Sequence, residues 1–384
     1  MPSPDAPPDL TCLETPALLL SQPKMAANIA RMQQRVAALG VAFRPHVKTA
    51  KCLPVAHAML GADAGPITVS TLREADEFAA AGFTDITYAV GITANKLAHV
   101  ARLLAMGVRL TVILDSVDAA RAVVAAADGF AAPLAVLIEI DTDAHRAGIV
   151  PTDATQLLAV AAALQHPQVQ VQGVLTHLGA SYDCRSPAAL QAAAEQERAG
   201  AVLAAGHLRE AGHAAPVISV GSTPTALFAQ ALPGVTELRA GVYVFHDLVM
   251  AGLGVCAPQD IAVSVLTTVI GRQPAKGWTL VDAGWMALSR DRGTASQPVD
   301  QGYGLVCDAQ GSVMDDYIVA AVNQEHGTIT HRSGDPALGL NLPVGTLLRI
   351  LPNHACATCA QFDAYQVIDA SNQVQARWPR FGGW

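Results

Sequence analysis

Short apolar segments alternate with longer alanine-rich segments between residues 41 and 242 of the chain. Most of the short segments are apolar on both faces, which is typical of parallel strands buried beneath helices. The predicted strands are Val41–Phe43, Ile67–Ser70, Asp85–Ala89, Arg109–Leu114, Leu134–Ile140, Val169–Thr176, Val217–Val220 and Thr236–Leu238. The predicted helices between them include Leu72–Ala81, Ala94–Met106, Ser116–Ala127, Asp153–Leu164 and Ala188–Ala211.

Eight β/α units are the number that closes a TIM-like (β/α)8 barrel, so the alternation predicts this α/β fold. A doubly wound open sheet is the alternative, but no Gly-x-Gly-x-x-Gly motif follows the first strand. We therefore expect a barrel domain over residues 21–250.

The pattern changes after Val242, where apolar segments are separated by Gly, Pro, Asp and Asn turns. The strands predicted in this region are Ile261–Ile270, Thr279–Val281, Tyr317–Val322 and Thr346–Leu351. They predict a second, mostly β domain over residues 251–384, completed by an N-terminal strand at about residues 11–20, around Pro16–Leu20. The amphipathic segment Lys24–Leu39 predicts a helix that leads into the barrel.

The composition favours a large core and a small-molecule partner. Of the 384 residues 51% are hydrophobic and 15% charged, and the net charge is only -8. No basic tract resembles a phosphate-backbone footprint, so a nucleic-acid partner is not expected. No apolar run approaches the ~20 residues that span a bilayer, and no signal peptide is visible, so no membrane association is expected.

Seven scattered cysteines argue against a disulfide framework and for the reducing cytoplasm. The first ten residues, Met1–Leu10, contain four prolines and predict a disordered or draped tail.

The stretch Arg44–Lys51, Arg-Pro-His-Val-Lys-Thr-Ala-Lys, directly follows the first predicted strand. It places Lys48 beside Arg44, His46 and Lys51, and burial among such neighbours should lower the affinity of an amine for a proton. A neutral amine can form a Schiff base with an aldehyde, which is how proteins hold pyridoxal phosphate. A solvated basic rim at the strand end is the alternative reading of this stretch alone.

Polar loops follow the later strands, at the barrel end where catalytic residues gather. The loops after strands seven and eight, which commonly bind phosphate in this fold, read Gly221–Thr225 and Arg239–Tyr243. Gly221 permits close backbone approach, Ser222 and Thr223 offer hydroxyl and N–H donors, and the following helix would favour an anion at its N-terminus. An ordinary helix cap is the alternative for this loop.

Two further loop residues are candidates for contact with a bound ring. His177, after the sixth strand, is either a core histidine or a side chain that lies against a heteroaromatic ring. Arg146, in the loop Asp141–Gly148 after the fifth strand, either pairs with Asp141 or Asp143 or points inward to hydrogen-bond a phenolate oxygen.

A second motif, Pro352-Asn353-His354-Ala355-Cys356, follows a predicted strand of the β domain. Residues two apart in extended chain point the same way, so His354 and Cys356 can share one metal ion. Imidazole and thiolate suit zinc, and two protein ligands leave positions open for water or substrate. The spacing also arises readily by chance, and Cys359 is close enough to be an alternative ligand.

In combination these motifs resemble the fold-type III pyridoxal-phosphate enzymes with an alanine-racemase-like barrel, and within them the D-serine dehydratase and D-threonine aldolase family. The resemblance extends over nearly the whole chain from Thr15 onward. It implies pyridoxal 5'-phosphate as the cofactor, with a role for each of the residues that match the motifs of the family. The implied roles are Lys48 as the Schiff-base lysine, Arg146 near the phenolic oxygen, His177 on the ring, Gly221, Ser222, Thr223 and Gly241 at the phosphate, Tyr243 near the pyridine nitrogen, and His354 with Cys356 as the metal pair.

The metal motif separates two branches of this family. Aldolases carry His-x-Asp where this chain has Cys356, and the stretches Asp282–Asp291 and Asn323–Gly327 also resemble the dehydratases. The resemblance therefore implies a metal-dependent dehydratase of D-3-hydroxy amino acids, with D-threo-3-hydroxyaspartate, converted to oxaloacetate and ammonia, as the preferred substrate. The metal is expected to be zinc, with manganese or magnesium as alternatives, and related enzymes are head-to-tail homodimers.

The additional carboxylate of hydroxyaspartate requires a cation. The candidates are Arg290, Arg292 and His326. The two arginines are preferred because the geometry of a guanidinium matches that of a carboxylate. A D-serine dehydratase and a D-threonine-type aldolase that yields glycine and an aldehyde are the alternatives within the family. A racemase, a non-catalytic pyridoxal-phosphate carrier and a metal-free binding barrel explain fewer of the motifs.

Overall fold

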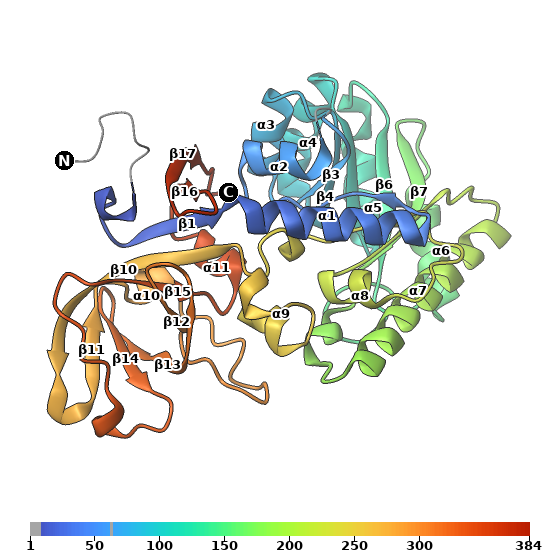
Figure 1. The fold of residues 1–384 in the computed structure, drawn as a ribbon. Coiled ribbons are helices and arrows are strands. Elements are labelled where there is room, and N and C mark those ends of the chain that lie inside the picture. Colours follow the sequence, from blue (N-terminus) through green and yellow to red (C-terminus); the bar gives the residue numbers. More distant parts are fainter. Residues whose placement is uncertain (1–8, 62–63) are drawn as a thin grey trace. The chain divides into compact units, whose positions relative to one another are not determined.

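Eight parallel strands form the sheet of the first structural unit (Figure 1). The computed structural model describes residues 9–61 and 64–384. The strands are β2 (Ala42–Phe43), β3 (Ile67–Val69), β4 (Asp85–Gly91), β5 (Arg109–Leu114), β6 (Leu134–Ile140), β7 (Val169–Thr176), β8 (Val217–Val220) and β9 (Glu237–Leu238). They are ordered β2-β9-β8-β7-β6-β5-β4-β3.

A backbone bridge joins the two ends of this sheet. The chain beyond β2 pairs in parallel with β3, because Thr68 N–H donates to Pro45 O (2.9 Å) and Val47 N–H donates to Thr68 O (3.0 Å). The predicted eight-stranded barrel is thereby confirmed.

Helices follow the strands in the order expected for β/α units. They are α2 (Leu53–Leu60), α3 (Leu72–Ala80), α4 (Leu97–Ala105), α5 (Val117–Ala126), α6 (Ala154–Ala163), α7 (Pro187–Glu210) and α8 (Thr223–Phe228). Thr71, Ser116 and Ser186 cap α3, α5 and α7, and each side chain accepts a hydrogen bond from the backbone N–H three residues later. Such caps satisfy N–H groups that have no partner inside the helix, and so fix where each helix begins.

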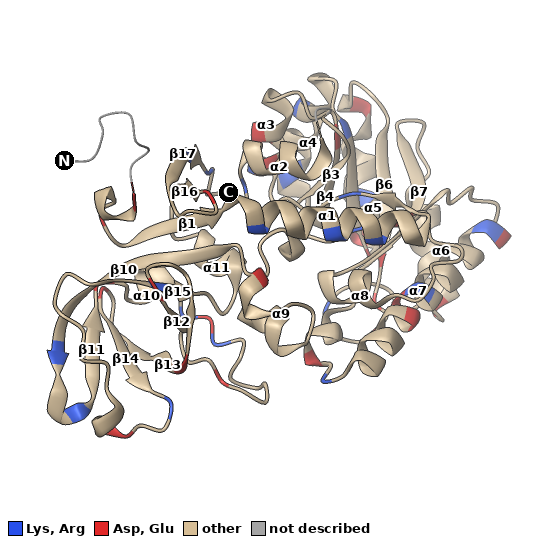
Figure 2. Cartoon of the chain, in the orientation of Figure 1, with Lys and Arg blue, Asp and Glu red and all other residues tan. Residues whose placement is uncertain are grey.

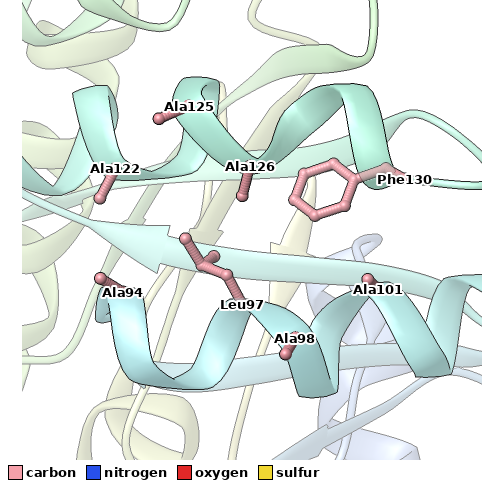
Figure 3. A pocket seen from close by; sticks show the side chains of 8 residues that line it. All are labelled: Ala94, Leu97, Ala98, Ala101, Ala122, Ala125, Ala126 and Phe130. Carbon is pink, nitrogen blue, oxygen red and sulfur yellow. The ribbon is translucent and has the colours of Figure 1, made fainter.

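The alanine-rich helices α4 and α5 leave a space between them. Between them lies an apolar pocket of about 440 Å³, lined mostly by alanine methyl groups together with Leu97 and Phe130 (Figure 3). Small side chains leave this space on the outside of the barrel. Because no polar group converges on the pocket, it lacks the features of a site for a specific polar ligand.

The second unit is mostly β-structure, as predicted, and consists of residues up to 30 together with 242–382. Its strands are β1 (Ala17–Ser21), β10 (Val263–Gln273), β11 (Trp278–Val281), β12 (Leu305–Asp308), β13 (Val313–Val322), β14 (Gly327–His331), β15 (Leu347–Leu351), β16 (Ala364–Ile368) and β17 (Val374–Pro379). Their order is β11-β14-β13-β12-β15-β10-β1-β16-β17, and β11 also pairs with β10. Six strands from β10 to β15 therefore form a closed ring, beside which β1, β16 and β17 continue the sheet.

Helices and turns complete this unit and connect it to the barrel. The helices are α1 (Gln22–Leu39), α9 (Leu248–Gly252), α10 (Trp285–Leu288) and α11 (Ala355–Cys359). Single 3-10 turns across the chain are η1 (Leu10–Cys12), η2 (Ala94–Lys96), η3 (Ala127–Gly129), η4 (Gly179–Asp183), η5 (Val242–Val244), η6 (Pro258–Asp260), η7 (Pro274–Lys276) and η8 (Pro336–Leu338). Four strands, β12, β14, β16 and β17, were not predicted, since each is short and mixes polar with apolar positions.

Residues 1–8 of the predicted N-terminal tail lie outside the described residues. Of its remainder, Leu10 is buried in an apolar cluster with Leu19 and Leu266 rather than disordered. None of the helices in the described ranges is long and apolar enough to cross a membrane. In the view of Figure 2, acidic and basic residues are scattered along both units without a continuous basic stripe.

Candidate active site

Lys48 lies in the turn that follows β2, at the carboxyl end of the barrel strands. The turn is held on both sides, because His46 N–H donates to Ala240 O (2.8 Å) and Val47 N–H donates to Thr68 O (3.0 Å). The Lys48 side chain is exposed to solvent, so the burial predicted from its sequence context was wrong. The barrel thus presents an accessible amine from a rigid backbone.

Two of the cations predicted to crowd this amine are neutralised by carboxylates. The Arg44 guanidinium bonds both Glu237 and Asp85 at 2.6 Å. Both acids are the first residues of their strands, and with Arg44 they line a cavity of about 470 Å³ at the amino ends of the strands, opposite the Lys48 turn. Lys51 pairs with Glu74 (3.1 Å). The prediction was therefore wrong for Arg44 and Lys51, because residues distant in sequence supply their counterions, from β4 and β9 for Arg44 and from α3 for Lys51.

His177 contacts the loop after β8, and its pKa is affected by the charges of two other predicted cofactor residues, Lys48 and Arg146. Its Nδ1–H donates to Gly221 O (3.1 Å). Burial, reinforced by the positive charges of Lys48 and Arg146, lowers the pKa of His177 to about 3. Its ring is therefore neutral at physiological pH, which suits a side chain that lies against an aromatic face without adding charge.

Arg146 is exposed in the loop after β6. Within the described part of the chain it forms no ion pair with Asp141 or Asp143, and Asp143 instead accepts from Ala180 N–H (2.7 Å). Its charge acts on His177 and on Glu139 of β6. The structure therefore brings Arg146, Lys48 and His177 to the same mouth of the barrel.

The two predicted phosphate loops contain glycines that no larger residue could replace. Gly221 has a φ of +133°, and a Cβ there would lie 2.1 Å from Arg239 O. A Cβ on Gly241 would lie 2.9 Å from His46 O, in the Lys48 turn. The close approach of three backbone segments at this mouth therefore depends on both glycines.

Ser222 caps α8 in a reciprocal capping box. Its Oγ accepts from Thr225 N–H (3.2 Å), and its own N–H donates to Thr225 Oγ1 (2.9 Å). Thr223 begins the helix and is buried. The cap that the sequence allowed is present, and it fixes the first turn of α8 at the barrel mouth.

A buried polar chain beneath this mouth was not predicted. Arg239 Nε donates to Ser219 Oγ (2.9 Å), and Ser219 Oγ donates to Glu237 Oε1 (2.6 Å). Arg239 also donates to Thr176 O, next to His177. The sequence could have indicated part of this chain, because Glu237 and Arg239 are two residues apart at the end of a strand and residues at that spacing in extended chain face the same side.

In the second unit, the structure brings His354 and Cys356 together. Their side chains are hydrogen-bonded, but not from an extended chain as predicted: His354 caps α11, and Cys356 lies in its first turn. A cap residue sits beside the first turn of its helix, which explains the proximity.

Asp291 holds the His354 ring. It is the last residue of the dehydratase-like stretch Asp282–Asp291, and no role was predicted for it. His354 Nδ1–H donates to Asp291 Oδ2 (2.7 Å), and Asp291 Oδ1 accepts from Gly293 N–H (2.7 Å). Although burial opposes the charge on His354, its bonds to Asp291 and Cys356 raise its pKa to about 11. A carboxylate on Nδ1 is the partner typical of a metal-ligating histidine, because it leaves Nε2 for the metal.

Two buried polar residues fix the loop before α11. Asp247 caps α9 and accepts from Ala355 N–H (2.9 Å), and Asn353 donates to Asp291 O (3.1 Å) and Gly302 O (2.7 Å). The loop around His354 is therefore tied by hydrogen bonds to three other segments, through the Asp247 side chain and through the backbone carbonyls of Asp291 and Gly302.

No group of three or more His, Cys, Asp or Glu side chains suited to a metal is found among the residues that the structure describes. The donor pair of imidazole and thiol is compatible with zinc, and a two-residue site would leave positions open for water or substrate. The chemistry of the pair therefore fits the predicted metal.

The remaining predicted residues also lie in the second unit. Arg290 is exposed and stacks on the Trp285 ring at 5.4 Å, whereas Arg292 pairs with Asp300 (2.6 Å). His326 is exposed, and Tyr243 is buried in η5, where burial raises the pKa of its phenol. Asp291 lies between Arg290 and Arg292 in sequence. Its hydrogen bond to His354 therefore holds this segment of the chain beside His354.

We expect Asp291→Asn to weaken metal binding about 10- to 100-fold, because the amide no longer anchors the imidazole as a carboxylate does. The measurement is competition of zinc between the protein and a chromogenic chelator. Asp316→Asn, which alters an exposed carboxylate of the same unit, is the control and should bind zinc like the unmodified protein. Equal zinc affinity in both variants would show that Asp291 does not support the site.

A parallel barrel with a lysine, a neutral imidazole and glycine-rich loops at its carboxyl-end mouth, followed by a β domain, defines the alanine-racemase class of pyridoxal-phosphate proteins. The family model for the alanine racemase N-terminal domain matches residues 20–248, and the putative serine dehydratase domain matches residues 262–368. The chain belongs to the family of the D-threo-3-hydroxyaspartate and D-serine dehydratases.

Two characterised relatives illustrate the similarity. D-threo-3-hydroxyaspartate dehydratase of Delftia sp. (strain HT23) is 54% identical over 98% of this chain and 99% of its own length. D-serine dehydratase of Dictyostelium discoideum is 32% identical over 95% of this chain and 96% of its own.

The solved structure of the Delftia enzyme has a TM-score of 0.94, covering 98% of this chain and all of that one. Two solved variants of D-threo-3-hydroxyaspartate dehydratase are similar as well: one, with a cysteine replaced by alanine, is in a metal-free form, and the other replaces a histidine two positions earlier.

Proposed function

We propose that this protein is a pyridoxal-phosphate- and zinc-dependent dehydratase of D-3-hydroxy amino acids. Its preferred substrate is D-threo-3-hydroxyaspartate, and the products are oxaloacetate and ammonia. The observation that carries the proposal is the match to the Delftia dehydratase over the whole chain together with the hydrogen-bonded pair His354 and Cys356. A cytoplasmic location is part of the proposal, supported by the absence of disulfides among the seven cysteines, all of which are in the described ranges.

The residues assigned to the cofactor have distinct roles in this proposal. Lys48 would hold the cofactor, and its amine, when free, would remove the Cα proton as a general base. When bound, the cofactor supplies a conjugated ring that withdraws electrons from the Cα–H bond. The other contacts are His177 on the ring face, Arg146 at the phenolic oxygen, Tyr243 near the ring nitrogen, and Gly221, Ser222, Thr223 and Gly241 around the phosphate.

His354 and Cys356 would hold the zinc ion, and Asp291 orients the imidazole. A Lewis acid is required because hydroxide is a poor leaving group, so the bond from Cβ to oxygen must be polarised as it breaks. The released enamine then hydrolyses in water to a keto acid and ammonia. The spacing of the two residues replaced in the D-threo-3-hydroxyaspartate dehydratase variants equals that between His354 and Cys356, which supports this ligand pair.

A product assay tests the proposal. Purified protein is given D-threo-3-hydroxyaspartate, D-serine and D-threonine separately, and keto acid, ammonia, glycine and aldehyde are measured. Oxaloacetate with an equal amount of ammonia is the expected result. Glycine with an aldehyde would instead identify an aldolase.

Selectivity for hydroxyaspartate is assigned to Arg290 rather than Arg292, because Arg292 already pairs with Asp300. Since a hydrogen bond to a charged group contributes about 1.5–3 kcal/mol, Arg290→Ala should lower kcat/KM for hydroxyaspartate about 10- to 100-fold, with a much smaller effect on D-serine. Arg292→Ala is the matched comparison. An equal loss on both substrates in Arg290→Ala would exclude the selective role.

The functional unit in this proposal is a homodimer, as the resemblance implies. Light scattering after gel filtration should give twice the 39.8 kDa mass of one chain. A mass of one chain at assay concentrations, with full activity, would contradict this part of the proposal.

A further inference from the structure

A cavity of about 170 Å³ lies within the β unit and separate from the His354 segment. It is bounded by the end of β1, the first turn of α1, strands β10, β12 and β15, and the turn between β16 and β17. Figure 1 shows strands β16 and β17 beside β1. Two of its lining side chains, Lys24 and Arg349, are cations. None of the residues assigned to the proposed reaction lines it.

Arg349 is 6% exposed and lies on β15 opposite Cys307 of β12. One guanidinium nitrogen, Nη2, donates to Asn372 Oδ1 (2.7 Å), but Nε has no hydrogen-bond partner in the described part of the chain. A buried donor without a partner costs about 1–3 kcal/mol. An acceptor bound in the cavity would remove this cost.

Lys24 adds a second positive charge from the first turn of α1, an 18-residue helix. Pro23 has no N–H, but the other N–H groups of this first helical turn point outward, and the helix dipole favours an anion at that end. Burial lowers the pKa of Lys24, and the charge of Arg349 acts in the same direction, whereas Cys307 and Asp260 act in the opposite one. Among the described residues, neither Lys24 nor Arg349 forms an ion pair with a carboxylate.

The acidic groups near the cavity accept hydrogen bonds within their own turns, and Asp260, whose charge reaches Lys24, accepts from Ala257 N–H (2.9 Å). Asp369 accepts from the N–H groups of Ser371 (2.8 Å) and Gln373 (2.9 Å) through one oxygen and from the Gln375 amide (2.8 Å) through the other. One oxygen of Asp308, Oδ1, accepts from two N–H groups of the turn after β12.

The thiol of Cys307 does not balance the cations either. Burial raises its pKa to about 12, so it is neutral at physiological pH. The cavity therefore combines two cations and a helix N-terminus without a carboxylate paired to either cation.

We propose that this cavity binds a small tetrahedral oxyanion, with inorganic phosphate as the ligand. Its volume sets the size of the ligand, because an engineered cavity of about 150 Å³ holds one benzene molecule. Phosphate is smaller than benzene, whereas a four-carbon dicarboxylate such as oxaloacetate is larger. Arg349, Lys24 and the first turn of α1 supply the donors.

Calorimetric titration of the pyridoxal-phosphate-loaded protein with inorganic phosphate tests this site, since the cofactor then fills its own phosphate loops. We expect one phosphate per chain, and affinity at least about tenfold lower in Lys24→Met, which removes one charge-assisted hydrogen bond. Lys276→Met is the matched control, because that lysine belongs to the same unit and stacks on Trp278 away from the cavity. It should bind phosphate normally.

Arg349→Lys provides a second variant that retains the charge and removes the Nε donor, so weaker phosphate binding is expected with the fold preserved. Crystals soaked in selenate should show anomalous density between Lys24 and Arg349. The proposal is overturned by the absence of binding heat, by equal affinity in Lys24→Met and Lys276→Met, or by selenate bound only elsewhere. Tighter binding of oxaloacetate than phosphate at the same cavity would overturn the assigned ligand.

Discussion

Lys48→Ala should lose at least about 10³-fold in turnover and also the visible absorption band of the lysine-bound cofactor. General-base catalysis alone contributes about 10²–10⁴-fold, and this variant loses the covalent anchor as well. Activity is measured as keto acid released, and attachment as the mass added to the Lys48 peptide after borohydride reduction. The second measurement reports the role of the residue without depending on turnover.

Lys96→Ala is the matched control, since Lys96 is a barrel lysine whose Nζ donates to the Tyr88 hydroxyl (2.7 Å). It should retain the absorption band, the modified Lys48 peptide and the activity. If Lys48→Ala kept both its absorption band and its activity, another amine would have to hold the cofactor, and the assignment of the β2 turn would be wrong.

Cys356→Ala should lose bound zinc and lower dehydration by about 10²-fold or more. A metal that polarises the leaving oxygen contributes several kcal/mol to the transition state, and every 1.36 kcal/mol corresponds to a factor of ten in rate. Zinc content is measured by mass spectrometry and dehydration by ammonia release. The cofactor band should persist, because all the residues assigned to its attachment and phosphate belong to the barrel unit.

Cys359→Ala distinguishes the two cysteines of α11. Cys359 is fully buried, and burial raises the pKa of its thiol to about 12, as suits a core residue rather than a metal ligand. The variant should keep its zinc at some expense of thermal stability. Zinc lost from Cys359→Ala and kept by Cys356→Ala would reverse the assignment.

The barrel was predictable because its strands are short, apolar and regularly separated by helices. Local composition alone is sufficient to predict such strands. Even the start of the two-residue strand β9 was predicted to within one residue. The β unit was less predictable. Strands such as β14, Gly-Thr-Ile-Thr-His, contain few apolar residues and are stabilised by pairing on both sides. One partner, β13, is adjacent in sequence, but the other, β11, is distant.

The site residues were predictable where a motif is local and unpredictable where a partner is distant. His354 and Cys356 are two residues apart, so the pair was visible in the sequence. Asp291 precedes His354 by 63 residues, and no local pattern distinguishes it from other aspartates. The same limit explains Arg44, whose carboxylate partners come from β4 and β9.

The most direct test of the central claim follows the products from D-threo-3-hydroxyaspartate before chelation, after chelation and after zinc is restored. The proposed function predicts oxaloacetate and ammonia in equal amounts, lost on chelation and recovered with zinc, while the cofactor band remains throughout. Glycine and an aldehyde as the products, or dehydration that is unaffected by complete removal of the metal, would contradict it.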